Sequence, residues 1–190
     1  MITEFLTQNL IDAEIIKDDN KEIVHYGIYG LLSTLFNFAT ILFIGVCCNC
    51  VLESILFTIA FYFLRIYAGG YHADTPKKCY FFSVGISIFN FLILRNLSLD
   101  FKILTLKFIL ASIIIFFLAP VDTINKPLDL TEKKEYQKKL RLIICTSTIL
   151  YLIFFFLKIY PVCWSISISY VTCSILLVIG IMKNNFKFNH

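Results

Sequence analysis

A histidine and a cysteine lie seven residues apart in a short polar segment between two long apolar runs. Residues 69–80 read Gly-Gly-Tyr-His-Ala-Asp-Thr-Pro-Lys-Lys-Cys-Tyr, which gives His72 and Cys79, and Arg65 precedes the segment. A cysteine thiolate is a strong nucleophile, and a nearby imidazole serves it as a base or as a cationic partner. These residue types predict a thiolate nucleophile and its histidine at a membrane surface.

Cys79 is expected in the first turns of a helix. The pair Gly69-Gly70 is unfavourable inside a helix, so the preceding apolar run is predicted to end there. Thr75 and Pro76 have the residue types of an N-cap and of a first helical position. A new helix is therefore predicted to start just before Cys79.

Two opposing effects act on the Cys79 thiol. The positive end of the helix dipole, the flanking Lys77 and Lys78, and an imidazolium at His72 favour the thiolate. Burial in the membrane favours the neutral thiol. A partly hydrated thiolate that is paired with the imidazole at the membrane interface satisfies both constraints.

The spacing requires His72 to lie in a loop. In one continuous helix, seven residues would put His72 and Cys79 on the same face but about 10 Å apart along the axis, which is too far for a hydrogen bond. We therefore expect the glycine pair and Pro76 to let His72 fold back over the helix start.

Each of these residues also has a simpler interpretation. His72 can be an ordinary interface residue, and Cys79 can be a packing residue. Asp74 can orient the imidazole or simply begin the helix. Arg65 can hold a carboxylate or polarise a carbonyl, or it can extend to the membrane surface. One histidine, one cysteine and one aspartate make a poor metal site, so no metal and no other cofactor is expected.

The composition indicates a membrane protein. The 190 residues are 58% hydrophobic and 16% charged, with a mean hydropathy of +0.80, whereas soluble proteins average about a quarter charged residues. The first residues include acidic and no basic side chains, so no cleaved signal peptide is expected. The net charge of +4 is small, and no nucleic-acid partner is expected.

We predict an all-α, polytopic membrane protein with a single domain over residues 1–190. Residues 1–20 show an amphipathic helical pattern, typical of a helix that lies in the membrane interface or docks on the protein. Six apolar runs follow, each near the length that crosses about 30 Å of hydrocarbon as a helix. Residues 121–140 are predicted as a basic loop. The predicted spans cover about residues 26–47, 50–67, 79–97, 103–120, 141–158 and 162–182, within a bundle of residues 26–182.

The cations predict the orientation in the lipid bilayer. If the N-terminus is cytoplasmic and all six runs span, thirteen of the 17 lysines and arginines fall inside and four outside. The four outside are Arg95, Lys102, Lys107 and Lys158. Since cytoplasmic loops are enriched in cations, both termini and residues 69–80 are expected on the cytoplasmic side.

The seven cysteines do not predict a disulfide framework, because their number is odd and most lie in apolar runs. Cys47, Cys48 and Cys50 suggest a metal or lipid site by their spacing, but no histidine lies near them in sequence. Small apolar residues at a helix end are the simpler interpretation.

The pattern Arg65-x3-Gly-Gly-x-His72-Ala-x-Thr-x3-Cys79 resembles the signature of the accessory gene regulator B (AgrB) family of membrane peptidases. A second similarity lies at residues 119–122, Ala-Pro-Val-Asp, followed by Asn-Lys-Pro and a lysine-rich stretch. The chain length, the amphipathic start and the number of apolar runs also resemble the family. The resemblance thus covers essentially the whole chain.

This resemblance implies a cysteine endopeptidase of the bacterial cell membrane that processes a small, AgrD-like precursor peptide in quorum sensing. Proteins of this family remove the C-terminal part of the precursor and help to close the remainder into a thiolactone or lactone, and they act as homodimers. The catalytic pair carried over to this sequence is His72 and Cys79. The candidates for substrate binding or oxyanion support are Arg65, Gly69, Gly70 and Lys126, with Asp74 as a possible orienter of the imidazole.

Rival functions remain open at the level of the sequence. A membrane cysteine peptidase that only hydrolyses would release linear products. A peptide transporter or export channel without proteolytic activity would use Arg65, Glu53 and His72 to line a path. A structural or sensory subunit has no positive support in the sequence.

Overall fold

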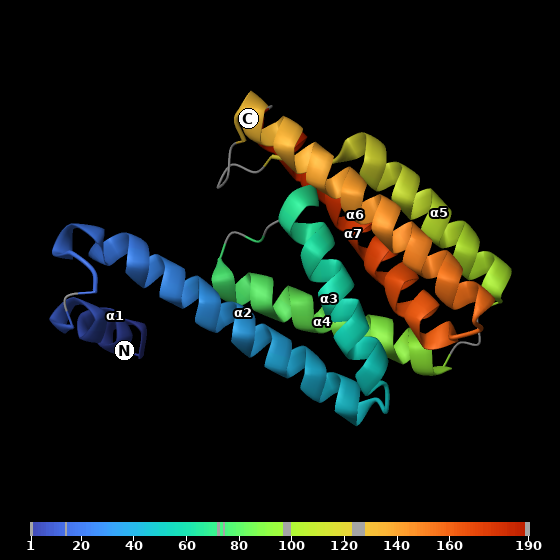
Figure 1. Cartoon of the computed structure of the whole chain (residues 1–190), viewed down its shortest axis with the longest axis horizontal. Helices are drawn as coiled ribbons and strands as arrows, with labels where there is room; N and C mark the ends of the chain where they lie inside the picture. The colour runs from blue at the N-terminus through green and yellow to red at the C-terminus, as the bar shows by residue number, and fades with distance from the viewer. Residues whose placement is uncertain are drawn as a thin grey trace. The chain divides into compact units, whose positions relative to one another are not determined.

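The structure, a computed structural model, describes residues 2–13, 15–71, 73, 75–96, 100–122 and 128–188. Within these ranges the chain is helical, and its one β-type pairing is an isolated bridge between Gly69 and Val121. Six helices, α2 to α7, are long and apolar enough to cross a membrane. The prediction of an all-α, multi-pass membrane protein is therefore confirmed. The elements are α1 (Ile2–Asp12), the 3-10 helix η1 (Asp18–Asn20), α2 (Lys21–Cys47), α3 (Val51–Ala68), α4 (Pro76–Asn96), α5 (Phe101–Leu118), α6 (Leu130–Phe156) and α7 (Tyr160–Phe188) (Figure 1).

The first of two compact units, Met1–Ile41, contains α1, η1 and most of α2. Helix α1 is shorter than the amphipathic helix predicted over residues 1–20, because it ends at Asp12. The chain turns there, and the carbonyl of Leu10 accepts hydrogen bonds from the amides of Ile15 and Ile16 at 3.1 and 3.4 Å. The amphipathic pattern continues past this turn in the sequence, so periodicity alone does not reveal it.

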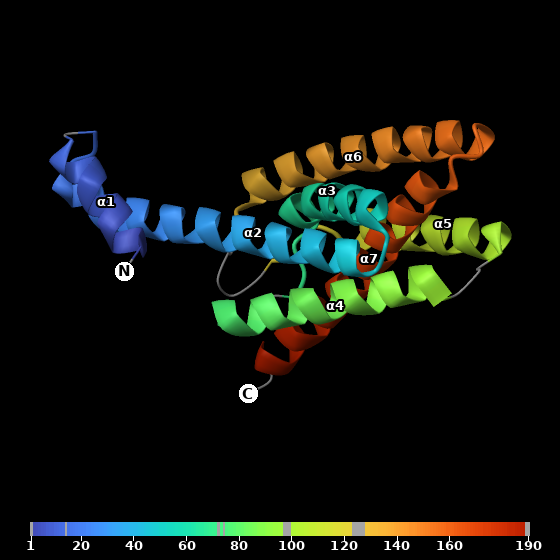
Figure 2. The ribbon, with the colours of Figure 1, turned by 90° about the horizontal axis from the view of Figure 1, so that it is seen from below.

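The second unit, Leu42–His190, is organised around α7. This helix is the most buried of the six candidate spans and packs most closely against α3 and α5. Figure 2 shows α6 on one side of α7 and α4 on the other. The buried core is largely apolar and includes Leu64, Ala68, Phe108, Ala111, Ile115, Leu140, Tyr151, Ile166, Tyr170 and Leu177.

Serine side chains bring α7 close to α3. The hydroxyls of Ser165 and Ser169 donate to the backbone carbonyls of Glu53 at 3.2 Å and Phe57 at 3.1 Å. Small hydroxyl residues suit helix pairs in a membrane, because they let the backbones approach and satisfy their own polar groups without water. These contacts fix the helix whose last turn carries Arg65.

The predicted helix boundaries around the polar segment are confirmed. Helix α3 ends at Ala68 with Gly69 as its C-cap. Helix α4 begins at Pro76, and the Thr75 hydroxyl accepts from the Lys78 amide at 3.3 Å. The chain therefore breaks between α3 and α4 at the residue types that predicted the break.

Helix α6 begins at Leu130, well before the apolar run predicted from residue 141, so residues 130–140 of the predicted basic loop are helical. A capping box explains this start: the Asp129 carboxylate accepts from the Leu130 amide at 2.7 Å, and Glu132 accepts from the Asp129 amide at 3.1 Å. Hydrogen bonds from the Thr131 hydroxyl and the Leu130 amide lower the pKa of the Asp129 carboxyl below its ordinary value. A hydropathy scan misses this start because the first turns are rich in charge.

Candidate active site

The loop after α3 passes through two glycines with positive φ. Gly69 has φ +70° and Gly70 has φ +101°. A Cβ at Gly69 would collide with the Val121 carbonyl oxygen, and a Cβ at Gly70 would lie 3.0 Å from the Leu176 carbonyl oxygen. Backbone conformation and close packing therefore both require glycine at these positions.

Arg65 holds this loop from the last turn of α3. Its Nη1 donates to the Gly69 carbonyl, and its Nη2 donates to the Tyr71 carbonyl. A planar guanidinium that contacts two carbonyls fixes both their distance and their direction. Arg65 was predicted to bind substrate, but in the structure two of its guanidinium nitrogens donate hydrogen bonds to the backbone of the loop.

Two further segments complete the support of the loop. The Val121 amide donates to the Ala68 carbonyl at 3.0 Å, and the Tyr71 amide donates to the Leu176 carbonyl of α7 at 2.9 Å. One turn later on α7, a Cβ at Gly180 would lie 2.5 Å from the Tyr71 nitrogen. The loop is therefore held by α3, by the chain after α5 and by α7.

Cys79 lies in the first turn of α4, and its side chain is partly exposed. Its amide donates to the Thr75 carbonyl at 3.0 Å, so the thiol sits at the positive end of the helix. The Arg65 guanidinium is close enough to interact electrostatically with this thiol. The rings of Tyr71 and Phe82, with centroids 5.2 Å apart, connect the loop to the same helix one turn later.

Two lysines add positive charge beside the loop. Lys183 Nζ lies 4.9 Å from the centroid of the Tyr71 ring, and Lys139 Nζ lies 5.7 Å from that of Tyr67. Both are cation–π contacts, which leave the positive charge in place. The end of the bundle that carries Cys79 is therefore electropositive, which favours an anionic ligand.

The predicted residues His72, Asp74 and Lys126 lie outside the described residues. Of the predicted site residues, the structure brings together Cys79, Arg65 and the Gly69-Gly70 pair. On either side of the segment that contains His72, Tyr71 and Thr75 are held by hydrogen bonds.

Sequence reasoning missed four residues that support the loop: Val121, Asp122, Leu176 and Gly180. Asp122 forms an ion pair with Lys133 at 2.7 Å, and its carbonyl accepts from Asn184 at 2.7 Å. The similarity at residues 119–122 signalled the first two without giving them a role. The roles of Leu176 and Gly180 could not be predicted from the sequence, because their contacts join distant parts of the chain. The only visible feature was a glycine in an apolar span.

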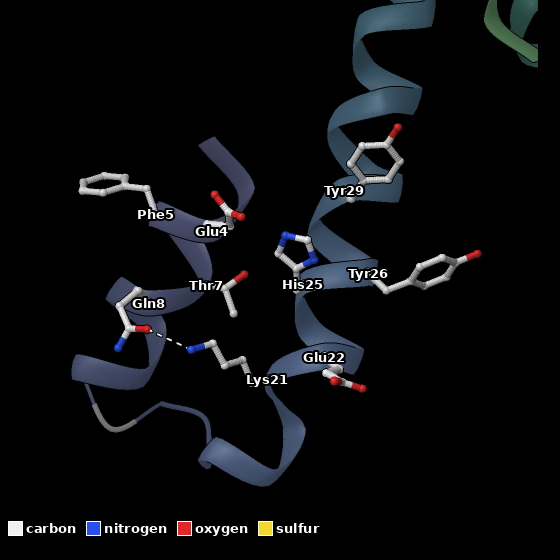
Figure 3. Close-up of a pocket in the computed structure, with 9 residues that line it drawn as sticks. All are labelled: Glu4, Phe5, Thr7, Gln8, Lys21, Glu22, His25, Tyr26 and Tyr29. Carbon is white, nitrogen blue, oxygen red and sulfur yellow. Dashed lines mark hydrogen bonds between the residues drawn. The ribbon is translucent and has the colours of Figure 1, made fainter. Parts of the chain in front are cut away.

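A separate pocket of about 920 Å³ opens in the first unit between α1 and the start of α2 (Figure 3). Lys21 Nζ donates to Gln8 Oε1 at 3.2 Å, and His25 Nε2 lies 3.1 Å from the Thr3 hydroxyl. These bonds tie the two helices together within this unit. Residues 69–80 belong to the second unit.

The arrangement at Cys79 is suited to nucleophilic chemistry. A helix N-terminus is a favourable place for an anion, and the Arg65 guanidinium adds a positive charge to the same region. Cys163 and Cys173, by contrast, are buried in the core. Among these three thiols, Cys79 alone combines exposure with a helix start.

Comparisons with known proteins identify the family of this chain. The sequence profile of the Accessory gene regulator B (AgrB) family matches residues 1–182. A putative AgrB-like protein of Clostridium perfringens (strain SM101 / Type A) is 32% identical over 169 residues, which cover 85% of this chain and 79% of that protein. Protein FsrB of Enterococcus faecalis is 28% identical over 148 residues, which cover 76% and 61%. No solved structure matches the chain. The profile match over nearly its whole length shows that this protein belongs to the AgrB family and acts in the quorum-sensing peptide pathway.

Proposed function

We propose that this protein is a membrane cysteine endopeptidase that removes the C-terminal part of a small precursor peptide and promotes cyclisation of the remainder. The observation that carries the proposal is the position of Cys79. This thiol is partly exposed at the start of α4, beside Arg65 and the loop that Arg65 holds. We assign the nucleophile to Cys79 and the general base to His72.

In the first step, Cys79 Sγ attacks the carbonyl carbon of the scissile peptide bond, and His72 takes the thiol proton. The C–N bond then breaks, and His72 transfers this proton to the leaving amine. The N-terminal part of the precursor stays on Cys79 as a thioester. The C-terminal part is released.

In the second step, an internal cysteine or serine of the precursor attacks the thioester carbonyl. The C–S bond to Cys79 breaks, the ring closes, and the proton of the attacking group passes through His72 to the Cys79 thiolate. Exchange of one thioester for another is nearly balanced in bond energy, whereas hydrolysis would discard the activated acyl group. A site that limits water at the start of a span favours closure.

The remaining predicted residues receive supporting roles in this proposal. Arg65 positions the loop and adds positive charge, while Gly69 and Gly70 give the loop the backbone conformation that supports the substrate beside Cys79. Asp74 orients the imidazole of His72. Lys126, with the other lysines around the loop, binds acidic residues in the tail of the precursor.

The proposed setting is a homodimer in the bacterial cell membrane, with the active site and both termini in the cytoplasm. The excess of cations at the ends of the spans that carry residues 69–80 supports this orientation. The whole chain acts as one AgrB-like domain in this proposal, and the precursor meets the active site before export.

The test is cleavage of a small candidate precursor peptide, taken from a reading frame next to this gene, co-expressed with the protein and followed by mass spectrometry. Cys79→Ala and His72→Ala are each expected to abolish cleavage while the protein still inserts in the membrane. Cys145→Ala is the matched control, because Cys145 is an exposed thiol on α6, and it should cleave normally. Cleavage at the normal rate by Cys79→Ala would end the nucleophile assignment.

The mass of the product separates cyclisation from hydrolysis. A cyclic product is one water lighter than the linear peptide. If only a linear product forms, at the normal rate, the proposed peptidase activity stands and the proposed cyclisation step is wrong.

A further inference from the structure

A cavity of about 300 Å³ lies between α4, the helix that carries Cys79, and the helices α5 and α7. Side chains of α4, α5 and α7 line it. It exists because α4 packs less closely against its neighbours than α3, α5 and α6 pack against α7. Its volume is at the lower end of the range for pockets that bind small molecules, about 300–1,000 Å³.

Cys79 heads the stripe of α4 that faces this cavity. Phe82, Ile86, Asn90 and Ile93 line it, and they follow Cys79 at steps of three or four residues. With 3.6 residues per turn, such steps keep side chains on one helix face. The cavity therefore lies along the face of α4 that Cys79 shares, and its lining begins one turn after the thiol, at Phe82.

Most of the side chains that line the cavity are apolar, but Lys107, Ser167 and a buried polar pair also line it. Asn90 Nδ2 donates to Thr172 Oγ1 at 3.0 Å, and both residues are more than nine-tenths buried. A primary amide has two N–H donors and a carbonyl acceptor, so this bond uses only part of the hydrogen-bonding capacity of Asn90. A ligand with both apolar side chains and backbone amides matches such a lining, whereas a hydrocarbon chain offers no hydrogen-bonding group.

The cavity and the loop share one residue. The side chain of Leu176 contributes to the cavity lining, and its carbonyl accepts from the Tyr71 amide. Phe82 likewise lines the cavity and contacts the Tyr71 ring. The cavity thus begins beside the loop and within one helical turn of Cys79.

We infer that this cavity is the acyl-side subsite of the enzyme, and that it holds apolar side chains of the peptide attached to Cys79. The inference rests on the proposed function, since that function supplies the acylated thiol. It adds the class of substrate: a precursor with bulky apolar residues close to the scissile bond on its N-terminal side. Seating those residues keeps the thioester away from water while the ring closes.

Trp164 allows a direct binding test, because it is the only tryptophan of the chain and it lines the cavity. The probe is an acetylated tetrapeptide amide of leucine and bromophenylalanine, added to Cys79→Ala protein in nanodiscs. Bromine quenches tryptophan fluorescence at contact. We expect saturable quenching of Trp164, and much weaker quenching by a serine-rich peptide with a single bromophenylalanine.

A matched pair of substitutions locates the bound peptide. Ile86 lines the cavity, whereas Ile88 on the same helix is exposed and does not line it. Ile86→Phe fills the cavity and is expected to weaken peptide binding at least about tenfold, while Ile88→Phe leaves binding unchanged. Equal affinities in both variants would overturn the inference.

A second variant keeps the test informative if Ile86→Phe does not fold. Ile86→Ala enlarges the cavity and is expected to bind a tetrapeptide with naphthylalanine more tightly than the parent protein does. No gain in affinity counts against the inference.

The same tryptophan distinguishes a peptide from a lipid chain. If brominated phosphatidylcholine quenches Trp164, and Ile86→Phe but not Ile88→Phe relieves this quenching, a lipid chain fills the cavity and the inference is wrong. Because binding is measured without the Cys79 thiol, the result is independent of catalysis. If the parent protein cleaves the precursor normally but the cavity binds no peptide, only the subsite inference is wrong. If the cavity binds the peptide but the parent protein never cleaves the precursor, the proposed peptidase function is wrong.

Discussion

At the scale of single residues, the site depends on a guanidinium and two glycines. Arg65 donates to the carbonyls on either side of Gly70, and Gly69 passes so close to Val121 that it has no room for a side chain. These contacts fix the loop that precedes Cys79. Their loss should therefore affect catalysis as well as stability.

Gly69→Ala is expected to destabilise the protein by about 1–3 kcal/mol, because alanine is strained at φ +70° and its Cβ meets a carbonyl oxygen. Cleavage of the precursor should fall with it. Gly85→Ala on α4 is the control, since nothing lies within 4 Å of a Cβ there, and alanine is favoured in a helix by up to about 1 kcal/mol. Thermal unfolding in detergent measures both, and equal melting temperatures would contradict the packing at Gly69.

Arg65→Lys keeps the positive charge but removes the planar fork. A single ammonium cannot reproduce two directed bonds to the Gly69 and Tyr71 carbonyls. We expect formation of the Cys79 thioester to slow more than about tenfold, which corresponds to a barrier higher by about 1.4 kcal/mol. Hydrogen exchange around Tyr71 should rise in parallel. A wild-type rate in Arg65→Lys would mean that charge, rather than loop geometry, is the contribution of this residue.

At the scale of elements, the helices and the start of α4 were predictable because their signals are local. Hydropathy identifies six spans, and Thr75-Pro76 identifies the start that places Cys79. The early start of α6 was missed because its capping box precedes a charged stretch. The contacts of Gly70 with Leu176 and of Gly69 with Val121 could not be predicted, since residues far apart in sequence make them.

The α6 start also has a predictable response to pH. The pKa of Asp129 is lowered by the Thr131 hydroxyl and the Leu130 amide. Its stabilisation of the first turn is therefore fully present above the ordinary pKa of an aspartate, and it is lost as the pH falls through the lowered value. Hydrogen exchange of the first α6 amides, measured across the acidic range, should show this loss.

Asp129→Asn is the control for this titration, because asparagine still caps a helix but has no carboxyl to protonate. Its first turn should lose less protection in the acidic range than the parent protein does, because only the Glu132 carboxylate of the capping box still titrates. The same pH dependence in Asp129→Asn would assign the effect to another group.

At the scale of the whole molecule, the chain is a multi-pass membrane protein of the AgrB family. Its second unit packs α3, α5 and α6 around α7 and leaves α4 less closely packed, with the proposed nucleophile at one end of α4. The bundle thus combines a well-packed scaffold with one helix that borders a cavity. The distribution of cations predicts the orientation of this bundle in the membrane, and labelling can measure it directly.

Lys138→Cys and Lys158→Cys test the orientation, since these exposed positions lie near opposite ends of α6. In a background with the other accessible cysteines replaced, a membrane-impermeant maleimide should label Lys158→Cys in intact cells. It should label Lys138→Cys only after the membrane is permeabilised. The opposite pattern would place Cys79 outside the cell and reverse the proposed topology.

Leu176 gives the cavity and the loop a thermodynamic connection. Leu176 lines the cavity, and its carbonyl accepts a hydrogen bond from the Tyr71 amide. A ligand that displaces Leu176 therefore also shifts the loop beside Cys79. Linkage between two sites is reciprocal. A substitution that shifts the loop between positions with different cavity affinities must therefore change the affinity of the cavity, even when it lies on α3 and touches no ligand.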